Sequence, residues 1–189
     1  MTAVEKTQNS SMTTNEQYDS IIKICTDIYT KKMKDYGTAW RILRPTSITD
    51  QIYIKAQRIR SIEEKGTSKI EDDIRSEFIG IVNYSIMGII QLELGTSEEA
   101  LPEAKALELY IKYFQEAKCL MEKKNHDYDE AWRSMRISSY TDLILMKINR
   151  TKQIEDNLGK TIISEGIDAN YYDMINYSVF GLIKLEFGE

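Results

Sequence analysis

Hydrophobic residues recur every three or four positions along most of the chain, the spacing that gathers side chains on one face of an α-helix. Amphipathic helices are predicted over about residues 17–34 and 105–125. Each is followed by a second helix that ends near Glu64 or Asp156, with Thr49 or Thr141 as its N-cap. The most apolar helices are predicted over about 70–94 and 164–187. No segment alternates as a β-strand does, so the sequence predicts an all-α fold.

The chain contains an internal repeat. The segment Asp35-Tyr36-Gly37-Thr38-Ala39-Trp40-Arg41 recurs 92 positions later as Asp127-Tyr128-Asp129-Glu130-Ala131-Trp132-Arg133. Further on, Asn83-Tyr84-Ser85 recurs 93 positions later as Asn176-Tyr177-Ser178, and about 27 of about 75 aligned positions are identical. We expect a six-helix bundle of two similar three-helix repeats, related by pseudo-two-fold symmetry and docked through their apolar helices.

Four segments are expected along the chain: a flexible N-terminal tail (1–16), the first repeat (17–95), a linker (96–104) and the second repeat (105–189). The first fourteen residues contain no apolar signal segment. The longest apolar stretch, 78–92, is too short and too often interrupted by polar residues to cross a membrane. We therefore expect a cytoplasmic protein without membrane contact, and a homodimer of the whole chain stays open.

The amino-acid composition limits which catalytic and metal sites the chain can form. The two cysteines lack metal-ligand spacing, and the single histidine, His126, cannot form a multi-histidine metal site or a nucleophilic triad. Charge is uneven, because residues 31–60 carry +6 and residues 123–152 carry +3 in a chain of net charge −5. Basic patches interleaved with Tyr and Trp suit a phosphate-bearing ligand whose base stacks on a ring, whereas the acidic remainder argues against duplex nucleic acid. The alternative is a pair of solvated helix faces.

Two pairs of cations are candidates for phosphate binding. Each pair has three-residue spacing on one helix face, so both side chains can reach a single phosphate. The alternative is that they pair with nearby carboxylates. The residues are Lys55 and Arg58 in the first repeat and Lys147 and Arg150 in the second.

Aromatic and amide side chains complete the candidate ligand sites. For the two tryptophans the alternative is a role in the core. An amide inside the most apolar helix needs a hydrogen-bond partner, which is either protein or ligand. The candidates are Tyr36, Trp40 and Asn83 in the first repeat and Tyr128, Trp132 and Asn176 in the second.

Carboxylates near the third helix of each repeat are candidates for binding Mg²⁺, which prefers oxygen ligands. Glu165 and Asp173 lie about two turns apart on one helix face and are the candidate catalytic residues. On the corresponding face the first repeat has Asp72, Ser76 and Gly80. The full set of candidate metal ligands is Glu155, Asp156, Glu165, Asp168 and Asp173.

The order Asp35-Tyr36-Gly37-x-Ala39-Trp40, Lys55-x-x-Arg58, an acid-rich turn and Val82-Asn83-Tyr84-Ser85 resembles the nucleotide modification associated domain (first type), a helical family of bacteria and phages. The resemblance covers about 18–95 and 107–188. The acidic face of that family's third helix is similar to the metal-binding helix of MazG-like, all-α nucleoside triphosphate pyrophosphohydrolases. The resemblance implies nucleotide chemistry with Mg²⁺ or Mn²⁺, although the middle acid of the family's face is replaced by Ser76 and Ala169 here.

Three functional hypotheses follow. In the first, the chain is a nucleotide-associated protein that acts as a metal-dependent nucleotide phosphohydrolase or nucleotide-modification factor, with Mg²⁺ or Mn²⁺ activating water. In the second, it is a non-catalytic duplicated module that binds a nucleotide or a protein partner without a cofactor. In the third, the residues shared by the repeats serve folding alone and line no cleft.

Overall fold

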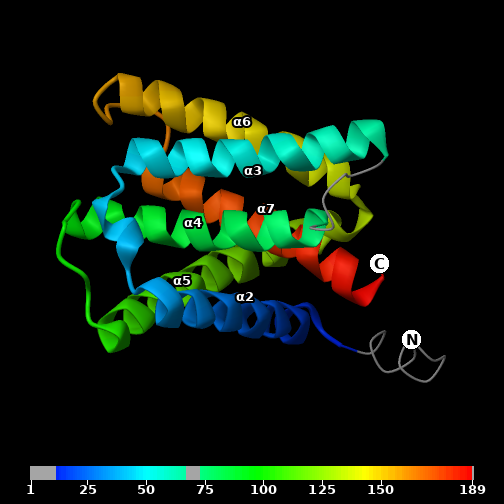
Figure 1. Cartoon of the computed structure of the whole chain (residues 1–189). Helices are drawn as coiled ribbons and strands as arrows, with labels where there is room; N and C mark the ends of the chain where they lie inside the picture. The colour runs from blue at the N-terminus through cyan, green and yellow to red at the C-terminus, as the bar shows by residue number, and fades with distance from the viewer. Residues whose placement is uncertain (1–11, 67–72, 189) are drawn as a thin grey trace.

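The computed structural model describes residues 12–66 and 73–188, which form six α-helices and two short 3-10 helices (Figure 1). These residues contain no β-strand, so the all-α prediction is confirmed. Each repeat consists of a long helix, a 3-10 turn and two further helices, as the internal repeat predicts. The first repeat contains α2 (Thr14–Tyr36), η1 (Ala39–Ile42), α3 (Pro45–Lys65) and α4 (Ile74–Leu94). The second contains α5 (Glu103–Tyr128), η2 (Ala131–Ser134), α6 (Ile137–Asp156) and α7 (Ile167–Phe187).

The six helices lie in three layers of two, with one helix from each repeat in every layer (Figure 1). The central layer is α4 and α7, which pack against each other and against α3 and α6 on one side. The layer on the other side is α2 and α5. Because the central helices are covered on both sides, they are apolar around most of their circumference, as the sequence predicted.

Glycines allow the two central helices to approach closely. A Cβ atom at Gly88 of α4 would lie 2.8 Å from the ring of Tyr171 on α7. At the equivalent place, a Cβ atom at Gly181 of α7 would lie 3.1 Å from the ring of Phe78 on α4. The two glycines and the two rings are related by the same offset of 93 residues as the surrounding sequence, so the central contact follows the pseudo-two-fold symmetry.

The second helix of each repeat begins one turn earlier than the sequence predicted, so the N-cap prediction was wrong. Helix α3 begins at Pro45, whose fixed φ and missing N–H suit the first helical position. Helix α6 begins at Ile137. Thr49 and Thr141 therefore lie inside the helices, where their hydroxyls donate to the carbonyls of Pro45 (3.1 Å) and Ile137 (3.5 Å).

Within the described ranges, α4 alone is long and apolar enough to cross a membrane by length and composition. Its most apolar window has a mean hydropathy of 1.2 and is 61% buried in the protein. Packing against α3 and α7 accounts for these apolar residues, which agrees with the prediction of a buried helix.

Candidate functional site

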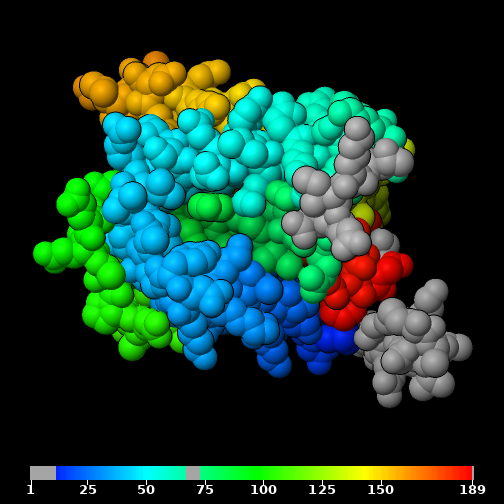
Figure 2. Space-filling model, in the orientation of Figure 1, coloured from blue at the N-terminus to red at the C-terminus, as the bar shows by residue number. Residues whose placement is uncertain are grey.

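A cavity of about 330 Å³ opens in the first repeat, between α2, η1, α3 and α4. In Figure 2 the green surface of α4 lies recessed between the blue surface of α2 and the cyan surface of α3. Aromatic rings from three elements line this first-repeat cavity: Tyr36 from α2, Trp40 from η1 and Tyr84 from α4. Tyr36 is exposed, whereas Trp40 is buried. The site therefore has an apolar inner wall and an open aromatic rim.

Three cations also lie on the wall of the first-repeat cavity, namely Lys32, Lys55 and Arg75. Lys55 lies 3.7 Å from a carboxylate oxygen of Glu77 and 5.7 Å from the ring centroid of Tyr84. Arg75 is bound to Glu186 of the second repeat. The three cations outnumber the two carboxylates that pair with them, Glu77 and Glu186, so the cavity carries a net positive charge.

The structure brings four of the five first-repeat ligand candidates to this cavity: Tyr36, Trp40, Lys55 and Asn83. The fifth, Arg58, does not line it. Its guanidinium binds the carboxylate of Glu77, the pairing that the sequence analysis gave as the alternative to phosphate binding.

The hydroxyl of Tyr29 is buried beside the same cavity and has no hydrogen-bond partner among the described residues. Its ring stacks on Tyr110 with the centroids 4.2 Å apart, which fixes the side chain in place. Burial raises the pKa of Tyr29, so the hydroxyl keeps its proton. A buried polar group of this kind ordinarily has a partner, so the cavity wall contains an unused hydrogen-bonding group.

The two asparagines predicted to need a partner find it in the protein. Asn83 accepts a hydrogen bond from the hydroxyl of Tyr110 (2.7 Å) and donates to the carbonyl of Cys25 (3.4 Å). Asn176 accepts from Tyr18 (2.7 Å) and donates to the carbonyl of Ala117 (3.0 Å) in the symmetric arrangement. Each amide thus joins its own repeat to the first helix of the other.

The corresponding place in the second repeat is filled by a carboxylate. Asp173 of α7 stands where the first repeat has Gly80, and it is buried. One of its oxygens lies 2.7 Å from the ammonium of Lys124 and the other lies 2.7 Å from that of Lys147. Burial alone would raise the pKa of Asp173, but the hydrogen bonds and charges of the two lysines outweigh it and lower that pKa. Asp173 is therefore ionised and held by both lysines.

Beside Trp132, the second repeat also has an aromatic ring that the first repeat lacks. Phe180 stands where the first repeat has Met87, and it stacks on Trp132 at a centroid distance of 4.4 Å and an interplanar angle of 7°. Trp132 is buried, and its indole nitrogen has no hydrogen-bond partner among the residues the structure describes. Tyr128, the other aromatic candidate in this repeat, is 70% exposed.

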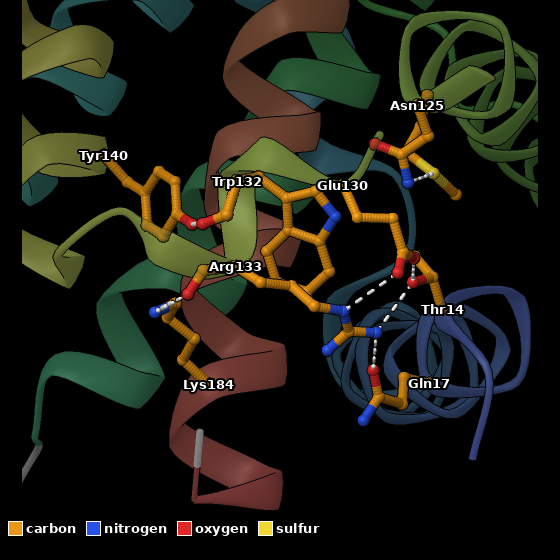
Figure 3. Close-up of polar contacts among 9 residues, drawn as sticks. Thr14, Gln17, Asn125, Glu130, Trp132, Arg133, Tyr140 and Lys184 are labelled. Carbon is orange, nitrogen blue, oxygen red and sulfur yellow. Dashed lines mark hydrogen bonds and ion pairs between the residues drawn. The ribbon is translucent and has the colours of Figure 1, made fainter. Parts of the chain in front are cut away.

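Polar contacts around η2 hold Trp132 in this position (Figure 3). The hydroxyl of Tyr140 donates to the carbonyl of Trp132, and the ammonium of Lys184 donates to the carbonyl of Arg133 (2.8 Å). The guanidinium of Arg133 reaches the start of α2, where it binds Thr14 (2.7 Å) and Gln17 (2.8 Å). The second-repeat turn is thereby tied to both α7 and α2.

A wider hollow of about 670 Å³ lies between the end of α6, the loop 157–166 and the start of α7. It brings together three of the second-repeat candidates, Lys147, Arg150 and Glu165. None of its lining residues in the described ranges is aromatic, and Ile162 and Ile163 are almost fully exposed. It offers charge without a surface on which a base can stack.

The candidate metal ligands do not converge. In the described part of the chain, no three His, Cys, Asp or Glu side chains come close enough to hold one ion. Both oxygens of Asp173 face lysines, whereas Glu165 and Asp168 are exposed. Asp156 is exposed too, and burial raises the pKa of Glu155, which lies against Thr49 and Asp50 of the first repeat. This donor set does not fit Mg²⁺ or Mn²⁺. Asp72, the acid predicted on the corresponding face of the first repeat, lies outside the described residues.

Several cavity residues were not identified from the sequence. Tyr29, Lys32, Arg75 and Tyr84 line the first-repeat cavity, and Gly80 forms part of its floor. A signal was available for Lys32, because Lys124 repeats it 92 positions later. For Tyr29 no signal existed, since Met121 occupies its place in the second repeat.

A family model described as nucleotide modification associated domain 1 matches the chain twice, over residues 32–92 and 124–185. The two matches fall on the two repeats and together cover more than half of the chain. No curated protein and no solved structure matches the chain. The expected similarity to MazG-like pyrophosphohydrolases is not shown by these comparisons and stays a prediction.

Proposed function

The chain belongs to the nucleotide modification associated domain 1 family, in two tandem copies, and on that premise we propose that it binds a nucleotide in the first-repeat cavity. The observation that carries the proposal is one wall that combines aromatic rings, cations and a buried hydroxyl that has no partner in the described part of the chain. Trp40, Tyr36 and Tyr84 offer faces for a base, and Lys32 and Lys55 offer charge for a phosphate. The hydroxyl of Tyr29 offers a further hydrogen bond.

The size of the cavity supports a ligand of this class. Small-molecule sites usually measure about 300–1,000 Å³ and combine an apolar lining with a few convergent polar groups. At about 330 Å³ the first-repeat cavity suits one mononucleotide rather than a polynucleotide. The net charge of −5 also disfavours broad contact with a nucleic acid backbone.

Binding, rather than hydrolysis, is the function that the geometry supports best. Hydrolysis of a phosphate chain by an enzyme of this kind needs carboxylates that gather around a metal ion, and the described carboxylates do not gather in this way. Catalysis with Mg²⁺ or Mn²⁺ stays an untested prediction, as do a cytoplasmic location, a homodimer and a protein partner. Trp40 and Asn83 line a cavity, which disfavours the hypothesis that the shared residues serve folding alone.

The test is isothermal titration calorimetry of the full chain with nucleoside mono-, di- and triphosphates, each with and without Mg²⁺. We expect binding of at least one nucleotide without metal. The variant Lys32→Ala should weaken that binding about tenfold, which corresponds to about 1.4 kcal/mol. Its matched control is Lys124→Ala, which removes the equivalent lysine of the second repeat, where Asp173 fills the site.

The outcomes separate the hypotheses. Equal loss of affinity in the two lysine variants would show that the first-repeat cavity is not the binding site. Binding seen only with Mg²⁺ would support the metal-dependent hypothesis instead. Absence of binding by every nucleotide would overturn the proposal and leave the protein-binding module to be tested.

A further inference from the structure

The two repeats have the same three side chains at equivalent positions and differ in what stands beside them. Lys32, Lys55 and Trp40 of the first repeat correspond to Lys124, Lys147 and Trp132 of the second at an offset of 92. The first repeat leaves a cavity beside these groups. The second repeat has two side chains of α7 there, Asp173 and Phe180.

The first of these side chains supplies negative charge. Asp173 lies between Lys124 and Lys147 at 2.7 Å from each, and its equivalent in the first repeat is Gly80. A Cβ atom at Gly80 would lie 2.7 Å from the Cδ and Cε atoms of Lys55. The far end of the flexible Lys55 side chain therefore lies over the glycine, and it has to shift aside before an anion can take the place that the Asp173 carboxylate has in the second repeat.

The second side chain supplies a ring. Phe180 stacks on Trp132 almost in parallel, at an angle of 7°. Its equivalent is Met87, which lines the first-repeat cavity together with Trp40. The wall that a ring covers in the second repeat is therefore open to a ligand in the first.

We propose that Asp173 and Phe180 occupy, in the second repeat, the places that the anionic group and the ring of the ligand occupy in the first. This inference rests on the proposed function and specifies its ligand. The anionic group lies over Gly80 between Lys32 and Lys55, and the ring lies against Trp40. The second repeat is a copy of the site that the chain closes with its own side chains, so each chain binds one ligand.

The distance between Asp173 and Phe180 indicates how far apart the anionic group and the ring of the ligand lie. Asp173 and Phe180 are seven residues apart on α7, which places them on nearly the same helix face about 10 Å apart along its axis. A free base or an aromatic acid such as benzoate is too short to cover both places. A nucleoside phosphate, with a sugar between its base and its phosphate, has the required ring, spacer and anion.

The proposed position of the anionic group over Gly80 is tested by introducing a carboxylate there. In Gly80→Asp the new side chain meets the far end of the flexible Lys55 side chain, which can shift aside. Gly80→Asn has the same size without the charge and serves as the control. At low salt the Asp variant should melt at a higher temperature than the Asn variant, and the difference should shrink as salt is added. Equal melting temperatures would overturn the inference.

The chemical class of the ligand is tested by titrating the protein with the common nucleoside 5′-monophosphates and 5′-diphosphates. The matching nucleosides probe binding of the ring alone, and inorganic phosphate probes binding of the anion alone. We expect the wild-type chain to bind one equivalent of nucleotide, at least tenfold more tightly than the nucleoside. Gly80→Asp should lose at least tenfold in nucleotide affinity and much less in nucleoside affinity, whereas Gly80→Asn should lose little of either.

A second variant removes the two side chains that fill the site in the second repeat. Asp173→Gly combined with Phe180→Met gives the second repeat the residues of the first at both places and should raise the stoichiometry from one nucleotide to two. A folded double variant that still binds one would contradict the inference, and if it does not fold, the Gly80 variants decide alone.

Failure of the inference is distinguishable from failure of the proposed function. Equal affinity for nucleotide and nucleoside, or unchanged nucleotide binding by Gly80→Asp, would overturn the inference while nucleotide binding stands. Absence of nucleotide binding by the wild-type chain would overturn the proposed function itself.

Discussion

The hydroxyl of Tyr110 on α5 donates a 2.7 Å hydrogen bond to the side-chain oxygen of Asn83 on α4. Both residues are buried, and they belong to different repeats. Tyr18 and Asn176 form the same bond with the repeats exchanged. The repeats are thus held together by a reciprocal pair of polar contacts as well as by their apolar helices.

We expect Tyr110→Phe to lower the free energy of unfolding by about 1 kcal/mol, because it removes one buried hydrogen bond and leaves the Asn83 oxygen without its donor. Tyr18→Phe should cost a similar amount. Urea denaturation monitored by circular dichroism measures both. Tyr36→Phe, at an exposed position, is the control and should stay within about 0.5 kcal/mol of the wild type. A cost at Tyr110 no larger than this control would show that the bond does not stabilise the fold.

The two central glycines should differ in their tolerance of a methyl group. Gly88→Ala forces a Cβ to within 2.8 Å of the Tyr171 ring, whose hydroxyl is anchored by Thr49 (2.8 Å) and the carbonyl of Pro45 (3.1 Å). We expect a loss of about 1–3 kcal/mol in unfolding free energy. Gly181→Ala, with 3.1 Å to the Phe78 ring, should cost less. Thermal denaturation compares the two, and the reverse order would contradict the packing described here.

Asp173→Asn should destabilise the protein near neutral pH by about 2 kcal/mol, because the largely buried ammonium of Lys147, with 12% of its side chain exposed, then loses its counter-charge. The pKa of Asp173 is lowered in the folded state, so its contribution is present above the unfolded pKa of about 4 and is lost as the pH falls through the lower folded value. The wild type and the variant should therefore converge in stability in acid. Urea titrations from pH 7 to pH 3 measure the difference, with Asp35→Asn at an exposed position as the control. A difference that is constant with pH would show that the carboxylate is not paired.

Tryptophan fluorescence should report ligand binding from one repeat only. The chain has two tryptophans, of which Trp40 lines the first-repeat cavity and Trp132 stacks on Phe180. In Trp132→Phe the remaining indole should change its emission when nucleotide is added, since the proposed site brings a base against it. In Trp40→Phe the emission of Trp132 should stay unchanged. An equal response in both variants would contradict a site confined to the first repeat.

The sequence predicted the helices and the duplication because both depend on local pattern. Apolar periodicity marks a buried helix face wherever it occurs, and repeated residues such as Trp40 and Trp132 are visible without a structure. Both tryptophans are buried, at 8% and 5% exposure, in agreement with the core role that the sequence left open for them. In the first repeat, Trp40 is part of the core and also lines the cavity.

The site was harder to predict because its charges come from separate helices. Sequence spacing predicted that Asp173 shares a helix face with Glu165 and favoured a metal, but this prediction was wrong because α7 begins only at Ile167. The spacing also gave no sign that Lys124 approaches Asp173 from α5. On the predicted acidic face Gly80 stands in place of an acid, and in the structure the end of the Lys55 side chain lies over it. The hydroxyl of Tyr29 is buried without a partner among the described residues, and no local sequence pattern predicts this.

Covalent connection of the repeats through residues 95–102 has a consequence for how they can differ. In a homodimer of identical subunits one gene encodes both sites, so a substitution that closes one site closes the other. Fusion removes this constraint, so the second repeat can have Asp173 bound by two lysines while the first keeps a glycine at that place and a cavity beside it. One half is then free to accumulate changes that favour rigidity, while selection for recognition acts on the other alone.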